Sequence, residues 1–429
     1  MLIIVLIIII LIIMCILLLN RNEKELFNEN NTIIENTSKP EIKSVDDSSK
    51  FFTVANCVSQ YLSEINKNND KYYAMDDDGS YKKIVEENYI KQNIYGLLSQ
   101  EYIEKNNITI NNLYDYIYDF NEQVMFVPIN MNVLSGTDVE KYIAYGFILN
   151  GSNELMEEIY IILNLDINNK TFSVEQINNQ YSSIDEIQID NKEIAIEKRD
   201  NNTFNYVNAT HEYIIKQYLN VYKRLALSKP EVAYNYLDEE YRIARFGNLE
   251  GYKAYVEKNR NSIFAKTVTK YKVSQEDEYK QYVCITQDDD YYIFRENSVM
   301  DYSVILDTYT IDLPEYIEKY NSSSENQKVA FCIDKFIKII NDENYTLAYN
   351  MLAESFKNNY FKTQASFEEY VKQNLLEKNN VTFGEFGNEA DAYYTYTTTL
   401  NNENNTDSVQ KTFIVRLKTG TDFELSFNV

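Results

Sequence analysis

The sequence predicts an α+β protein in which three tandem domains follow an N-terminal transmembrane helix. Three observations support this fold class. Residues 2–19 are uniformly apolar, one amphipathic helix pattern occurs three times, and strand-like segments follow each copy of that pattern. Helices followed by a strand meander are typical of domains in which helices pack on one face of a curved antiparallel sheet.

Residues 1–19 are predicted to form a transmembrane anchor. The apolar run 2–19 has 18 residues, which at a rise of about 1.5 Å per residue just span a bilayer core. A cleaved signal peptide and a lipoprotein signal at Cys15 fit less well. No basic region precedes the run, and Met14 stands where lipidation requires a small residue. We therefore expect a single-pass protein of the cell membrane.

Residues 20–50 are predicted to form a flexible linker, because they are polar, rich in Asn, Glu and Ser, and without sustained periodicity. Arg21 and Lys24 favour a cytoplasmic location of the following domains by the positive-inside rule. Glu23 and Glu25 lie among them and weaken that bias. We expect the soluble domains to be extracytoplasmic.

The repeated pattern is an amphipathic helix. Residues 54–66 read VANCVSQYLSEIN and residues 329–341 read VAFCIDKFIKIIN, with apolar residues at helical spacing. Residues 214–226 carry the same apolar stripe with one polar exception, Gln217. A second pattern, Tyr-x-x-Leu followed by an aromatic residue, begins at Tyr95. It begins again 139 residues later, at Tyr234, and a further 115 residues later, at Tyr349. The chain therefore contains three copies of one unit.

These copies set the predicted domain boundaries. The first domain covers residues 51–200 and carries an insertion at about 67–93, because the spacing between its two patterns is longer than in the other copies. The second covers residues 201–322 and the third residues 323–429. In each copy the helices are followed by segments rich in β-branched and aromatic residues, which predict strands, for example 123–134, 280–286 and 410–418.

The best preserved stretches are AYNYLDEEYRIARFGNLEGYKAYV at 233–256 and AYNMLAESFKNNYFKTQASFEEYV at 348–371. A long helix, a short helix with Tyr-x-x-Leu, a third helix with aromatic ends and a curved sheet resemble the nuclear transport factor 2-like superfamily, with its cystatin-like cone. The resemblance covers residues 51–429. It implies a cone-shaped sheet around a pocket, which some members use for catalysis and many use for dimerisation or for holding a ligand. Membrane-anchored bacterial members resemble the predicted layout.

The sequence predicts no catalytic residue. His211 is the single histidine, and we expect it in the solvent-exposed first turn of a helix. Gln217 is the first place to look for a ligand-binding residue. It stands where the other two copies have cysteine, so its amide either hydrogen-bonds inside the domain or faces the pocket.

Metal and cofactor sites are not predicted either. The stretch MDDDGS at 75–80 resembles the centre of a calcium loop, but Ala74 and Val85 occupy the first and last ligand positions. QDDD at 287–290 is expected to be a hairpin turn. Outside the apolar run the cysteines are odd in number and lack CxxC spacing, so we expect free, buried thiols at Cys57, Cys284 and Cys332.

The net charge of the chain limits the kinds of partner that it can bind. The formal net charge is −25, and no cluster of Lys and Arg is present. Such a surface repels phosphate backbones, so nucleic-acid binding is not expected. The first interpretation of the acidic surface is that it keeps the protein soluble. The second is that it attracts basic partners or divalent cations.

The sequence therefore predicts a membrane-anchored, non-enzymatic assembly or scaffold protein of a bacterial envelope, with the bilayer (through residues 2–19) and envelope proteins as partners. The alternative is a small-ligand-binding protein that uses a cone-shaped pocket, and a pocket enzyme comes third. Scaffolding predicts domain interiors filled by the protein's own large side chains. Binding or catalysis predicts a roomy pocket with converging polar groups.

Overall fold

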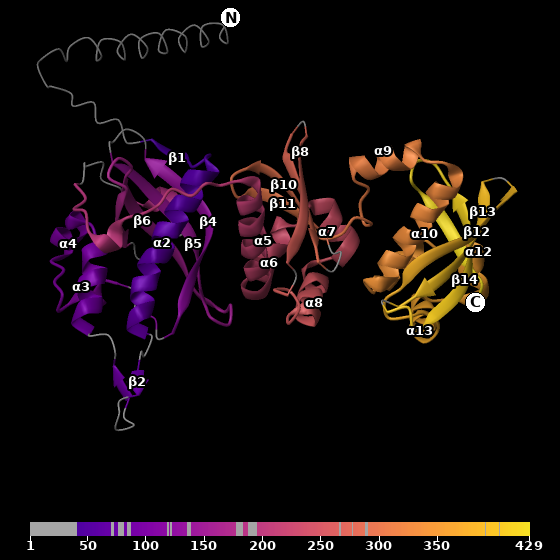
Figure 1. The fold of residues 1–429 in the computed structure, drawn as a ribbon, viewed down its shortest axis with the longest axis horizontal. Coiled ribbons are helices and arrows are strands. Elements are labelled where there is room, and N and C mark those ends of the chain that lie inside the picture. Colours follow the sequence, from indigo (N-terminus) through magenta and orange to yellow (C-terminus); the bar gives the residue numbers. More distant parts are fainter. Residues whose placement is uncertain are drawn as a thin grey trace, which may run out of the picture.

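The computed structural model describes residues 41–429, apart from short internal stretches. Those stretches are residues 70–72, 76–80, 84–86, 118–119, 121, 135–138, 177–182, 188–194, 266, 277, 288–290, 391 and 403. Three α+β units lie in a row along the long axis of the molecule (Figure 1). We call them repeats one, two and three, with the boundaries predicted above.

Repeat one has a five-stranded antiparallel sheet in the order β1-β4-β5-β6-β7. Its elements are β1 (Ile42–Ser44), α2 (Ser48–Asn69), the hairpin β2 (Tyr73–Met75) and β3 (Tyr81–Lys83), α3 (Glu87–Leu97), α4 (Gln100–Asn106), β4 (Val124–Leu134), β5 (Glu140–Asn150), β6 (Leu155–Asp166) and β7 (Thr171–Gln176). The β2–β3 hairpin lies within the predicted insertion.

Repeat two has a four-stranded antiparallel sheet in the order β11-β10-β9-β8. Its helices are α5 (His211–Ser228), α6 (Pro230–Tyr236), α7 (Glu239–Phe246) and α8 (Leu249–Asn259). Its strands are β8 (Val268–Gln275), β9 (Lys280–Thr286), β10 (Tyr291–Ser298) and β11 (Asp301–Ile305). A further helix, α9 (Pro314–Ser322), follows the sheet and leads into repeat three.

Repeat three has a four-stranded antiparallel sheet in the order β12-β13-β14-β15. Its helices are α10 (Glu325–Asn341), α11 (Tyr345–Asn350), α12 (Glu354–Tyr360) and α13 (Gln364–Asn374). Its strands are β12 (Asn380–Ala390), β13 (Tyr393–Asn401), β14 (Ser408–Leu417) and β15 (Phe423–Phe427). Helices precede the strand meander here, as they do in repeat two.

The same backbone contact joins helix to sheet in all three repeats. Leu98, Leu237 and Leu352 each form a parallel bridge to the last strand of their own sheet, at Val174, Val304 and Leu425 respectively. The spacings of these leucines are 139 residues (237 − 98) and 115 residues (352 − 237), the same as in the repeated sequence pattern. Each is the leucine of the Tyr-x-x-Leu pattern. The pattern therefore marks the point where the second helix attaches to the sheet edge.

The apolar stripe of each long helix is buried. In α2 the side chains of Val54, Cys57 and Tyr61 are fully buried, and Val329, Cys332 and Phe336 occupy the corresponding positions in α10 with equal burial. Polar residues at the N-termini satisfy free backbone N–H groups: Thr210 accepts from the backbone of α5, and Ser324 forms a capping box with α10.

Repeats one and two share one hydrophobic core cluster, whereas repeat three has its own. The Phe52 ring of α2 contacts the Tyr213 ring of α5 at 5.4 Å between centroids. Across the same junction the Lys229 ammonium pairs with Glu158 at 2.7 Å. The junction with repeat three is more polar, since Tyr309 donates to the Asp342 carboxylate and Lys258 pairs with Glu343.

Two predictions about the N-terminal region need correction. The fold class included a single-pass transmembrane helix at residues 2–19, which lie outside the described residues. Among the described residues no helix could cross a membrane. The longest, α2, carries Lys50, Glu64 and Lys67, so it is apolar on one face only. For the described residues the structure supports an α+β fold with one main antiparallel sheet in each of the three repeats, the small β2–β3 hairpin, and no helix that could cross a membrane. The localisation stays a prediction.

The second difference concerns the predicted linker. Its last part, residues 42–50, contains β1 and the beginning of α2. Ile42 to Ser44 pair with Leu134 to Asn132 of β4, and Val45 is buried beside them. A three-residue strand is too short to give a visible alternation in the sequence, so its pairing is decided by the neighbouring strand.

Candidate functional site

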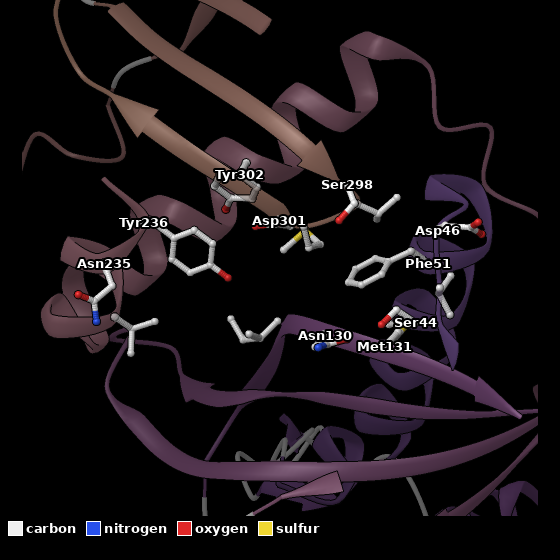
Figure 2. A pocket seen from close by; sticks show the side chains of 15 residues that line it. Ser44, Asp46, Phe51, Asn130, Met131, Asn235, Tyr236, Ser298, Asp301 and Tyr302 are labelled. Atoms are coloured by element: carbon white, nitrogen blue, oxygen red, sulfur yellow. The ribbon is translucent and has the colours of Figure 1, made fainter. Parts of the chain in front are cut away.

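A groove with a volume of about 560 Å³ lies where repeats one and two meet (Figure 2). We call it the junction groove. Repeat one contributes residues from β1, the start of α2 and β4, and repeat two contributes residues from α6 and the β10–β11 turn. The lining residues are Ser44, Val45, Asp46, Phe51, Ile129, Asn130, Met131, Val232, Asn235, Tyr236, Ser298, Val299, Met300, Asp301 and Tyr302.

Backbone irregularities on both sides shape the groove. The register of β4 against β5 shifts between Pro128 and Asn130, which places a bulge at the groove wall. On the other side, Met300 has a left-handed backbone with φ of 64°. Its backbone N–H donates to the Tyr218 hydroxyl at 3.2 Å, which ties the β10–β11 turn to α5. Both walls are therefore held by the surrounding fold.

Two tyrosines from repeat two form the inner part of the groove. In Figure 2 the hydroxyls of Tyr236 and Tyr302 point toward the space between the two repeats. Their ring centroids are 4.9 Å apart. The Tyr302 hydroxyl is buried and makes no hydrogen bond to any part of the chain that the structure describes. A buried hydroxyl without a partner costs about 1–3 kcal/mol, so this group is unusual for a native interior.

Both tyrosine hydroxyls keep their protons at neutral pH. Burial raises the pKa of Tyr302 well above its ordinary value of 10.0, and the nearby Tyr236 adds to the shift. Burial, followed by the charge of Asp301, raises the pKa of Tyr236 to about 12. The two groups are therefore available as hydrogen-bond donors and as acceptors.

The lining is acidic and contains no Lys, Arg or His. Asp301 begins β11 and acts on the Tyr236 hydroxyl through its charge. Asp46 lies at the opposite rim, and its carboxylate points away from the groove in Figure 2. Phe51 of repeat one and Tyr236 of repeat two face each other across the space (Figure 2). The groove thus combines a negative charge with aromatic surfaces.

The interior of repeat two, in contrast, is filled. The Tyr218 ring stacks on Tyr302 at 4.4 Å between centroids. The Glu296 carboxylate is buried there and accepts hydrogen bonds from the hydroxyls of Tyr218 and Tyr282, the latter at 3.0 Å. Lys280 lies 3.5 Å from the same carboxylate. Every oxygen of Glu296 has a partner, so this acid has a structural role.

Aromatic side chains also fill the interior of repeat three. Phe336 of α10 contacts the rings of Phe367, Phe413 and Phe427 at 6.2–6.5 Å between centroids. All four residues are buried. The packed rings leave the inner face of the sheet covered by the protein itself.

The predicted site residues lie elsewhere. Gln217 is half-buried on α5 and does not line the junction groove. His211 is the exposed first residue of α5, as expected, with its ring 5.9 Å from that of Tyr282. Residues 288–290 of the predicted turn lie outside the described residues; the strands before and after them, β9 and β10, pair at Ile285 and Tyr291.

Neither metal nor thiol chemistry is supported by the described residues. Most of the acidic stretch at 75–80 lies outside them, and no cluster of metal-binding side chains occurs within them. Cys57, Cys284 and Cys332 are free and buried, as predicted. Burial raises the pKa of the Cys284 and Cys332 thiols to about 12, so they are poor nucleophiles at neutral pH.

No protein-family model, curated protein or solved structure matches this chain. The resemblance to the nuclear transport factor 2-like superfamily therefore stays a prediction from topology. Sequence reasoning missed the junction groove, because its lining comes from several separate segments without a common motif. The one available signal was the acidic composition, which favours basic partners.

Proposed function

We propose that this chain is a non-enzymatic interaction protein that binds protein partners through the surfaces and junctions of its tandem repeats. The observation that supports this most directly is the filled interior of repeats two and three. Aromatic rings occupy the space beneath each sheet, and the buried Glu296 is fully hydrogen-bonded. Catalysis in such a unit requires an open pocket with a poised acid or base, whereas assembly requires rigid, stable surfaces.

The shared core of repeats one and two supports the same proposal. A continuous apolar core and the Lys229–Glu158 ion pair hold these two units together, so the surface that crosses their junction is preorganised for binding. Small-molecule binding is the second candidate. It is favoured by the volume of the junction groove, which lies within the range of about 300–1,000 Å³ that is typical of ligand pockets.

Crosslinking mass spectrometry on the full chain in its native cells tests the proposal. We expect reproducible crosslinks to a small set of proteins. A matched chain with Asn235→Trp, an exposed position in the groove lining, separates partners at the junction groove from partners elsewhere. Absence of crosslinked partners, together with a co-purifying small molecule, would favour the second candidate and refute the first.

A further inference from the structure

We propose that the junction groove docks a lysine or arginine side chain, flanked by apolar residues, from a protein partner. This inference deepens the proposed function and rests on it. Three features of the groove determine the chemistry of its occupant: an uncompensated charge, the partly exposed ring of Tyr236 and an unpartnered hydroxyl.

The charge requires a cation. Asp301 is exposed at the groove, and none of the lining residues is basic. The Asp301 backbone pairs with Ser298, but its carboxylate forms no ion pair or hydrogen bond with the described part of the chain. The net charge of −25 adds a favourable long-range field for a basic partner and an unfavourable one for an acidic partner. An anionic ligand would meet repulsion without a compensating contact.

The aromatic ring of Tyr236 selects an organic cation with an apolar stem. Phe51 and Tyr236 bound the groove from the two repeats (Figure 2); Phe51 is buried, whereas Tyr236 is partly exposed, so Tyr236 offers the ring that can attract a cation within about 6 Å through its π-electrons. Met131 and Met300 also line the groove, where they are almost fully buried and contribute apolar atoms to its wall. Lysine and arginine have this amphipathic character, since their aliphatic stems pack on apolar groups while the charged end reaches a polar partner.

The Tyr302 hydroxyl supplies the second, independent indication of a ligand. Its side chain is 4% exposed, lines the groove and has no hydrogen-bond partner among the described residues. The hydroxyl oxygen itself is buried, so an ammonium or guanidinium N–H can donate to it, while it pairs with Asp301, once the side chains at the inner end of the groove shift. Occupation would thus satisfy a polar group that the fold leaves unsatisfied.

The shape of the groove favours a polypeptide over a free amine. The lining residues Asn235 and Asp301 are exposed, so a chain can pass along the groove while one side chain enters. Its walls belong to two repeats, and their shared core keeps them at a fixed separation. The two repeats therefore need not move relative to each other when a short segment binds, and the conformational change is limited to side chains at the inner end of the groove.

The test is a calorimetric titration of the full chain with the blocked peptide acetyl-Leu-Lys-Leu-amide. Saturable binding is expected, with no binding of acetyl-Leu-Glu-Leu-amide. Asp301→Asn should weaken binding about tenfold, because it removes a charge-assisted contact, and Tyr302→Phe should weaken it several-fold. Asp46→Asn is the matched control: it removes the same charge, but from a carboxylate that points away from the groove, so its effect should be less than about twofold.

Each other outcome overturns the inference. No saturation up to about 1 mM lysine peptide would exclude the site, and equal weakening by Asp46→Asn and Asp301→Asn would show a diffuse acidic surface instead. Spermidine binding as tightly as the peptide would identify a small-amine site rather than a docking site for a protein. Crosslinks to partners at other surfaces would leave the proposed function intact even if the peptide failed to bind, so the two failures are distinguishable.

Discussion

Replacement of Tyr302 by phenylalanine is a sharp test of the geometry at the junction groove. Loss of a buried hydroxyl destabilises most proteins, because it leaves the hydrogen-bond partner unsatisfied. Tyr302 has no such partner in the described structure. Its ring, which stacks on Tyr218 and contacts Phe294, is retained by phenylalanine. We therefore expect the free energy of unfolding to stay constant or to rise by up to about 1 kcal/mol, since an unsatisfied polar group is removed.

Tyr218→Phe is the matched control, because the same atom is removed from the ring stacked on Tyr302. The Tyr218 hydroxyl donates to the Glu296 carboxylate and accepts from the backbone N–H of Met300. Loss of this hydroxyl removes one hydrogen-bond donor from the buried Glu296 carboxylate. It also removes the hydrogen bond that connects the β10–β11 turn to α5. Hydrogen bonds to charged groups contribute about 1.5–3 kcal/mol, so we expect a loss of about 2–3 kcal/mol.

Urea unfolding followed by far-ultraviolet circular dichroism measures both variants. The difference between them should be at least about 2 kcal/mol, with equal slopes against urea concentration. A loss of more than about 1 kcal/mol in Tyr302→Phe would refute the reasoning, since it would mean that the hydroxyl has a stabilising partner. Equal stability of the two variants would refute the structural role assigned to Glu296.

Three further predictions concern the cores. At pH 8 Cys284 and Cys332 of the native chain should react slowly with a thiol reagent, because burial raises their pKa to about 12. Roughly one of these thiols in ten thousand is then ionised, and rapid labelling of either residue before unfolding would contradict this. Burial also raises the pKa of Tyr222 and Tyr241 well above 10.0. The folded state then favours the neutral phenols, so their contribution to stability is present below pH 10 and is lost as the pH rises further. Absorbance at 295 nm should show that these two tyrosines ionise only when the protein unfolds. Ionisation of these tyrosines before unfolding would contradict their burial. Phe336→Ala should lower the free energy of unfolding of repeat three alone by about 3–5 kcal/mol, because that repeat has its own core. Limited proteolysis of this variant should cut within residues 323–429 first. Uniform cleavage along the chain would argue for one cooperative core.

Much of the fold follows from local sequence patterns. The stripe of apolar residues in α2 and α10 predicts helices with one buried face, and the structure buries those residues. The leucine of each Tyr-x-x-Leu pattern makes the equivalent bridge to a sheet edge in all three repeats. These features are predictable because helix periodicity is a property of residues that are neighbours in sequence.

The membrane helix and the linker show where such reasoning fails. Residues 2–19 lie outside the described residues, and no described helix is both long enough and apolar enough to cross a membrane. The end of the predicted linker forms β1, because a short segment takes its structure from the strand beside it. Composition alone does not reveal that pairing.

The sequence by itself determined the three repeats, the buried faces of their long helices and the acidity that favours basic partners. Only the tertiary structure decided that the interiors of repeats two and three are filled and that a groove lies between repeats one and two. Its lining extends from Ser44 to Tyr302, a separation of 258 residues (302 − 44). The physical reason is that the groove, and the lack of a hydrogen-bond partner for the Tyr302 hydroxyl, depend on contacts between segments that are distant in the sequence. Local sequence patterns do not predict such contacts.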